Sequence, residues 1–136
     1  MKIVNSPPPN YAEILQHFSP PPGTVFCYGQ TIYNPSKGEI PPDIEYHESI
    51  HMAQQAKYST PDLWYIKYFL DPQFRLDQEL EAYSAQYLWV KQHAGSKAAR
   101  FCLEESAGAL SRDYKLPLNP QQALSKIRNR AKSMVY

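Results

Sequence analysis

The sequence contains few cysteines and no excess of one charge. Its only cysteines, Cys27 and Cys102, both stand in apolar surroundings. Two cysteines do not make the disulfide framework of a small secreted domain, so we expect reduced, buried thiols. The 14 basic and 13 acidic residues leave a net charge of +1. Because the sequence has no basic stripe, we expect no nucleic-acid partner.

Long apolar segments are missing as well. The longest apolar-leaning stretch, residues 63–70, is interrupted by Lys67 and is far shorter than the ~20 residues that span a bilayer. The N-terminal residues lack the apolar core of a signal peptide. We therefore expect a cytoplasmic protein with no membrane partner. The sequence does not specify an oligomeric state.

Proline, in contrast, is frequent, and its positions divide the chain into predicted elements. Proline triplets at 7–9 and 20–22 flank a short amphipathic segment, for which we predict a helix over residues 11–18. Residues 24–34 are rich in β-branched and aromatic side chains around Gly29, which predicts a bent strand or hairpin. We expect residues 39–40 to add a short returning strand.

The remainder of the chain carries helix-start signals, in which a polar cap or a proline precedes an apolar run. The predicted helices cover residues 41–58, 61–70, 72–93, 97–111 and 119–133, with Thr60 and Asp71 as N-caps and Gly95 as a stop. The sequence thus predicts a single domain over residues 1–136. Its fold class would be mainly helical α+β, with a small N-terminal sheet or hairpin before the helix that starts at Pro41.

The predicted helix 41–58 contains the motif His47-Glu48-Ser49-Ile50-His51. Histidines four residues apart lie on one helix face, one turn apart, and can bind the same zinc ion. Glu48 lies about 100° further round the helix and is free to take a proton from a zinc-bound water. The motif therefore predicts zinc as cofactor and Glu48 as general base. We expect the core-facing residues of this helix to be apolar: Ile44, Ile50, Met52 and Ala53.

A catalytic zinc needs a third protein ligand. No cysteine is near the motif, and His17 and His93 are better explained as ordinary surface or partly buried histidines. Glu79 and Glu81 lie on the following long helix, but residues two apart point about 200° away from each other, so only one can face the zinc. We favour Glu79, because it shares a polar face with Arg75, Tyr83 and Gln86. Arg75 either steadies the Glu79 carboxylate or forms an ordinary ion pair.

The HExxH motif, an intervening helix and Glu79-Leu80-Glu81-Ala82 together resemble the gluzincin metallopeptidases over about residues 28–86. The sequence is most similar to the small, minigluzincin-type members and to related peptidases with an ExxxD motif. This resemblance implies a zincin-like metallopeptidase domain with zinc on His47, His51 and Glu79, and a strand above the HExxH helix as the rim of the cleft. In the relatives an aspartate four residues after the ligand supports a metal-binding histidine. Here Tyr83 stands in its place.

The expected activity is hydrolysis of a peptide or protein substrate. Glu48 would act as general base, with Tyr83 or Tyr114 donating to the oxyanion. Gln54 or Gln55 would contact the site from one turn past His51. The strand over residues 25–33 would either pack in the sheet or pair with an extended peptide. Two alternatives remain open, namely a latent or inactive zinc-binding protein and a helical interaction module with incidental histidines.

Overall fold

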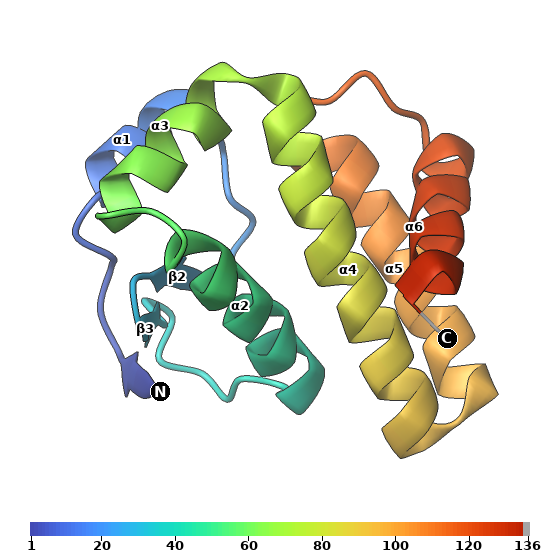
Figure 1. Cartoon of the computed structure of the whole chain (residues 1–136). Helices are drawn as coiled ribbons and strands as arrows, with labels where there is room; N and C mark the ends of the chain where they lie inside the picture. The colour runs from blue at the N-terminus through green and yellow to red at the C-terminus, as the bar shows by residue number, and fades with distance from the viewer. Residues whose placement is uncertain (135–136) are drawn as a thin grey trace.

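The computed structural model describes residues 1–134 and has the predicted mainly helical α+β fold (Figure 1). In chain order its elements are β1 (Lys2–Val4), α1 (Tyr11–His17), β2 (Phe26–Tyr28), β3 (Thr31–Tyr33), α2 (Pro42–Gln55), α3 (Pro61–Leu70), α4 (Pro72–Ala94), α5 (Ser96–Asp113) and α6 (Pro120–Met134). None of the helices within residues 1–134 is long and apolar enough to cross a membrane. Cys27 and Cys102 are free and buried, as expected.

The sheet is small and has the strand order β1-β3-β2. The predicted hairpin is confirmed, because β2 and β3 pair antiparallel with Cys27 opposite Ile32. Gly29 begins the two-residue loop with a φ of 64°, a value that glycine adopts without strain, as in type II′ hairpins. The sequence did not predict β1, which pairs parallel to β3. Such parallel pairing joins segments far apart in the chain, so no local pattern announces it.

Most of the helix-start signals are confirmed. The Asp71 side chain accepts hydrogen bonds from the backbone N–H groups of Gln73 and Phe74 and so caps α4. Asn119 and Gln122 cap α6 reciprocally, since each side-chain oxygen accepts from the other's backbone N–H. Thr60 occupies the N-cap position of α3 but makes no side-chain capping bond.

Two predictions near α2 are wrong. Residues 39–40 form no strand, because the prolines at 41 and 42 offer no N–H for a ladder. Ile40 instead packs against the cluster formed by Cys27, Ile32 and Met52. Helix α2 also ends at Gln55 rather than near residue 58, since the chain already turns at residues 56–60 before the start of α3.

Helix α2 lies between the sheet and α4, so that its inner face is enclosed from two sides (Figure 1). Helices α5 and α6 pack behind α4 and bury the main apolar core, which includes Leu103, Leu110 and Ile127. A second, aromatic core of Trp64, Tyr65 and Tyr68 fixes α3 against α1 and the hairpin. The packing therefore clamps α2 and α4 side by side.

Candidate metal centre

The buried face of α2 is polar. His47, Glu48, His51, Gln54 and Gln55 are all buried, and Met52 is the only apolar residue of this helix that is equally buried within the described chain. The prediction of an apolar core face is wrong at Ala53, which is exposed. The reason is that the arc of α2 facing α4 is filled by the two histidines and Gln54, while Gln55 faces the hairpin.

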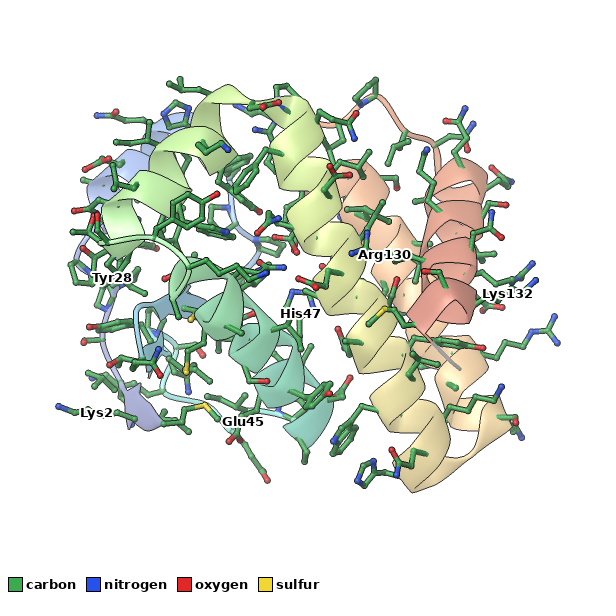
Figure 2. All side chains as sticks on the ribbon, in the orientation of Figure 1. Lys2, Tyr28, Glu45, His47, Arg130 and Lys132 are labelled. Atoms are coloured by element: carbon green, nitrogen blue, oxygen red, sulfur yellow. The ribbon has the colours of Figure 1, made fainter. Side chains whose placement is uncertain are left out.

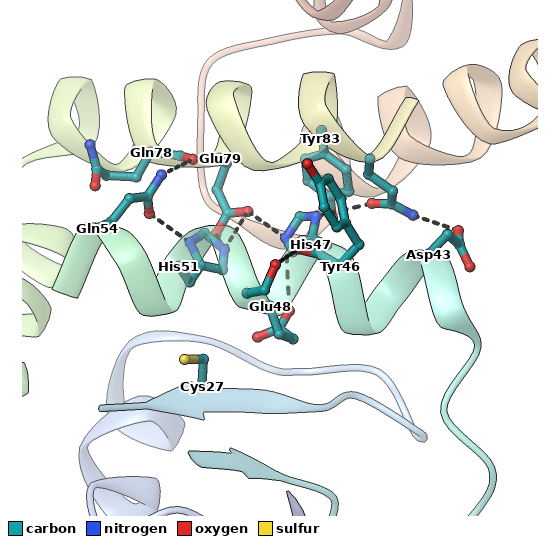
Figure 3. A network of polar contacts seen from close by, with 12 residues as sticks. Cys27, Asp43, Tyr46, His47, Glu48, His51, Gln54, Gln78, Glu79 and Tyr83 are labelled. Carbon is teal, nitrogen blue, oxygen red and sulfur yellow. Dashed lines mark hydrogen bonds and ion pairs between the residues drawn. The ribbon is translucent and has the colours of Figure 1, made fainter. Parts of the chain in front are cut away.

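His47 and His51 point at the carboxylate of Glu79 on α4 (Figure 3). The distance from Nε2 of His47 to Oε1 of Glu79 is 3.3 Å. The distance from Nε2 of His51 to Oε2 of Glu79 is 3.2 Å. Glu81 does not take part in this cluster, because it points to the side of α4 where Gln54 lies. Of the two candidates, Glu79 therefore faces the histidines.

The three side chains fit a zinc ion. In a tetrahedral site with metal–ligand bonds of about 2.0–2.1 Å, neighbouring ligand atoms are about 3.3 Å apart. Oε1 of Glu79 lies close to this spacing from both histidines, 3.3 Å from Nε2 of His47 and 3.2 Å from Nε2 of His51. Imidazole nitrogen and carboxylate oxygen are also ligands that zinc prefers. His47, Glu48 and His51 each bring a ligand atom to within 4.8 Å of the others, so the Glu48 carboxylate lies beside the same point.

The outer nitrogen of His47 has its own partner. Nδ1 of His47 lies 3.0 Å from Oε1 of Gln86 on α4. Nε2 of Gln86 in turn donates a 2.7 Å hydrogen bond to Asp43, which stands one turn before His47 on α2. Sequence periodicity placed Gln86 on the same helix face as Glu79 but assigned no role to Gln86. Asp43 was not predicted to be part of the site.

The outer nitrogen of His51 has an analogous partner. Nδ1 of His51 lies 2.8 Å from Oε1 of Gln54, as expected for a residue one turn further along α2. Nε2 of Gln54 donates a 2.7 Å hydrogen bond to Glu81. Gln55, the other candidate, does not contact a histidine. Its side chain bonds the hairpin backbone at Gly29 and Cys27 and thereby fixes β2 to α2.

Two residues that the sequence did not single out shape the site from α3. The hydroxyl of Tyr68 donates a 2.6 Å hydrogen bond to Oε2 of Glu79. The ring of Trp64 lies beside that of His51, with centroids 5.4 Å apart. Both residues belong to an aromatic helix whose pattern indicates only burial, so no sequence signal separates them from core residues.

Arg75 does not contact Glu79, and the idea that it steadies this carboxylate is wrong. Its guanidinium instead donates to the backbone carbonyls of Tyr68, Phe69, Tyr114 and Lys115. Arg75 lies one turn before Glu79, but its long side chain reaches past the helix to the end of α3 and to the loop after α5. It therefore ties that loop to the end of α3.

Tyr83 and Tyr114 form a hydroxyl pair beside the cluster. Their oxygen atoms are 2.6 Å apart. The ring of Tyr83 meets that of His47 edge-on, with centroids 4.4 Å apart. Tyr114 follows the end of α5, and its backbone is held by Arg75. Both predicted oxyanion donors thus lie at the site, and one of the two hydroxyl protons is free to reach a ligand.

Burial and charge shift the ionisation of the acidic groups in opposite directions. Burial raises the pKa of Glu48, although the neighbouring histidines oppose this shift. Burial also acts to raise the pKa of Glu79, but His51 and the hydrogen bonds from both histidines outweigh it and hold that pKa well below the ordinary value. The two carboxylates of the site therefore differ, because the pKa of Glu79 is lowered and that of Glu48 is raised.

A cavity of about 580 Å³ reaches the cluster and is lined by His47, Glu48, His51 and Glu79. Its walls are largely apolar and aromatic: Ile14, Phe18, Phe26, Tyr65, Phe69 and Tyr114. The proline segment 20–22 also lines it. Strand β2 forms part of the wall and is an edge strand, although the carbonyl of Cys27 is already bonded by Gln55 and Tyr65.

The remaining histidines lie elsewhere. The ring of His17 stacks on that of Phe69 with centroids 4.5 Å apart. His93 is exposed near the end of α4 and stacks on Trp89. In Figure 2, His47 lies between α2 and α4, whereas Lys2, Glu45 and Lys132 extend outward from the surface. Over residues 1–134, the group of potential metal ligands consists of His47, Glu48 and His51, and it contains neither His17 nor His93.

The chain matches no protein-family model, no curated protein and no solved structure. The case for a function therefore depends on the distances, burial and charges at the centre itself. The resemblance to the small gluzincins stays a prediction.

Proposed function

We propose that this protein is a zinc-dependent hydrolase of peptide bonds, with His47, His51 and Glu79 as zinc ligands. The observation that carries the proposal is the convergence of two histidine Nε2 atoms on one buried carboxylate, at 3.2 and 3.3 Å. These distances equal the spacing of ligand atoms around a tetrahedral zinc ion. Because the outer Nδ1 atoms already face glutamine oxygens, the two Nε2 atoms are directed inward at Glu79, where a zinc ion would replace the protons that they donate.

The residues around the cluster suit hydrolysis. A zinc ion bound there would lower the pKa of a coordinated water toward neutrality and polarise a carbonyl group. Glu48 lines the cavity, and its Oε2 lies 3.8 Å from Nε2 of His47, so it can accept the proton of an attacking water and return it to the leaving amine. Tyr83 is placed to donate to the carbonyl oxygen.

The cavity favours a catalytic over a structural metal. Structural zinc sites are closed by four protein ligands, whereas catalytic sites have three and an open position. Here three ligands of zinc-binding type converge at the wall of a cavity of about 580 Å³. Peptide hydrolysis is the reaction class that we favour, because the cavity has the edge strand β2 along one wall and room for apolar side chains.

The test begins with zinc content and affinity. Protein purified without chelator should bind about one zinc ion, and His51→Ala should lose it. His93→Ala is the matched control, because His93 is exposed at the far end of α4 and should leave zinc binding unchanged. A wild-type chain that binds zinc no better than millimolar overturns the proposal.

The second arm separates a hydrolase from an inactive zinc-binding protein. The zinc-loaded wild type should cleave an unfolded protein substrate such as casein, and Glu48→Gln should retain zinc but lose at least about 100-fold in rate. If the zinc-loaded wild type cleaves no faster than Glu48→Gln, the peptidase proposal is wrong even though the zinc site is right.

A further inference from the structure

Each histidine of the centre belongs to a three-membered chain of contacts that crosses from one helix to the other. The first chain runs from His47 through Gln86 to Asp43, with distances of 3.0 and 2.7 Å. The second runs from His51 through Gln54 to Glu81, with distances of 2.8 and 2.7 Å. In the first chain the amide of Gln86 comes from α4 and the carboxylate of Asp43 from α2. In the second the amide of Gln54 comes from α2 and the carboxylate of Glu81 from α4.

The carboxylates determine which way each amide points. An ionised carboxylate only accepts hydrogen bonds, so the NH₂ end of the glutamine must face it. The carbonyl end of Gln86 is then left facing Nδ1 of His47. The NH₂ end of Gln54 donates both to Glu81 and to the backbone carbonyl of Gln78, at 2.7 and 3.0 Å, and these two acceptors together turn its carbonyl end toward His51. Both glutamines are 3% exposed, so water does not offer them an alternative partner.

The amide orientation in turn determines the histidine tautomer. A carbonyl oxygen only accepts, so each glutamine favours an imidazole with a proton on Nδ1. Nε2 then faces Glu79, which accepts its proton in the zinc-free chain, and a zinc ion would take the place of that proton. A reversed amide would present NH₂ to Nδ1 and favour a proton on Nε2, which opposes metal binding.

We propose that the two outer carboxylates are positioning residues that hold both histidines in the metal-binding tautomer. The residues concerned are Asp43, acting through Gln86, and Glu81, acting through Gln54. This inference rests on the proposed zinc site and adds to it the residues that prepare the ligands.

The first test replaces Asp43 by its neutral, nearly isosteric amide. Asp43→Asn removes the preference of Gln86 for one orientation and should weaken zinc binding about 10- to 100-fold, the usual effect of removing an outer partner of a ligand. The matched control is Asp77→Asn. Asp77 accepts a 3.1 Å hydrogen bond from Gln73 on the exposed side of α4, which is the same kind of contact without a histidine beyond it. The zinc affinity of Asp77→Asn should equal that of the wild type.

The second test exchanges the carboxylate of residue 43 and the amide of residue 86. In the double variant Asp43→Asn/Gln86→Glu, the new carboxylate accepts from Nδ1–H of His47, and the new amide donates to that carboxylate. The direction of the hydrogen bonds is thereby restored, and zinc affinity should return to within about fivefold of the wild type. A role of Asp43 limited to the charge at the start of α2 would not be rescued by a change on α4.

The ¹⁵N chemical shifts of the imidazoles read the tautomer directly. In the zinc-free protein at about pH 10.5, Gln86 and Glu79 both accept from the His47 ring, and the fraction of His47 with Nδ1–H should be larger in the wild type than in Asp43→Asn. If Asp43→Asn and Asp77→Asn match the wild type in both zinc affinity and tautomer, the inference is overturned while the zinc site stands. If the wild type binds no zinc, the proposed function fails, and the ¹⁵N spectra still decide whether the outer carboxylates select the tautomer.

Discussion

The hydroxyl of Tyr68 donates a hydrogen bond of 2.6 Å to Oε2 of Glu79. Tyr68 belongs to α3 and Glu79 to α4, so the contact depends on how these two helices pack. It holds the carboxylate in the orientation in which its oxygen atoms face both histidines. An aromatic residue that the sequence marks only as buried is thus part of the support of the proposed third ligand.

We therefore expect Tyr68→Phe to weaken zinc binding by about tenfold, since the variant removes a hydrogen bond to a charged group worth about 1.5–3 kcal/mol. Competition with a chromophoric chelator measures the change. Tyr65→Phe is the control, because the hydroxyl of Tyr65 bonds the backbone carbonyl of Cys27 instead. It should destabilise the fold while leaving zinc affinity within about twofold. Equal zinc affinities in both variants would contradict the assigned role.

Tyr83→Phe should reduce kcat by about 10²- to 10³-fold with little effect on KM or zinc affinity, because the hydroxyl acts on charge that develops in the transition state. Tyr114 touches the site through Tyr83, at an oxygen–oxygen distance of 2.6 Å. Tyr114→Phe should therefore have the smaller effect. Steady-state kinetics with a fluorogenic peptide decides the order, and a larger loss in Tyr114→Phe would assign the oxyanion contact to Tyr114.

Arg75→Met should lower the free energy of unfolding by about 3–5 kcal/mol, because it leaves four backbone carbonyls without their donor. Arg75→Lys should recover little, since an ammonium group lacks the planar fork that reaches several acceptors at once. Urea unfolding of the zinc-free protein measures both variants. The idea is contradicted if Arg75→Lys is as stable as the wild type.

The stability of the zinc-free chain should fall as the pH becomes alkaline. Burial opposes a charge on His51, but Glu79 outweighs it and raises the pKa of His51 from 6.5 to about 9. A pKa that is higher in the folded than in the unfolded chain stabilises the folded state below about pH 6.5, and this stabilisation is lost as the pH rises through 9. We expect a loss of about 2–3 kcal/mol from this group between pH 6.5 and 9.5.

The matched variant for this prediction is His51→Gln, which removes the titrating group. Urea unfolding across this pH range should give a steeper decline for the wild type than for His51→Gln. Parallel stability curves for the two proteins would show that His51 gains no proton affinity on folding.

The sequence predicted the helices well because their signals are local. Asp71 followed by proline announces the start of α4, and the structure confirms its capping bonds. The returning strand at residues 39–40 failed for a local reason too, since the prolines that follow it cannot join a ladder. In contrast, β1 was not predicted, because its partner β3 lies far along the chain and the residues near Lys2–Val4 carry no local signal for that pairing.

For the site, spacing within a helix was enough to bring His47 and His51 to one face and to favour Glu79 over Glu81. It also pointed to Gln54, one turn beyond the motif. Spacing failed for Arg75, because a long side chain can leave the face on which its backbone stands and bond to another segment.

The sequence by itself therefore determined the mainly helical α+β fold, the HExxH face of α2 and the face of α4 that carries Glu79. Only the tertiary structure decided how the two faces meet, which tyrosine holds Glu79, and which carboxylates stand behind the histidines. The physical reason is that helix periodicity is set by backbone geometry within a few residues. The contacts of Tyr68, Gln86 and Glu81 depend instead on the packing of α3 and α2 against α4, which many distant residues determine together.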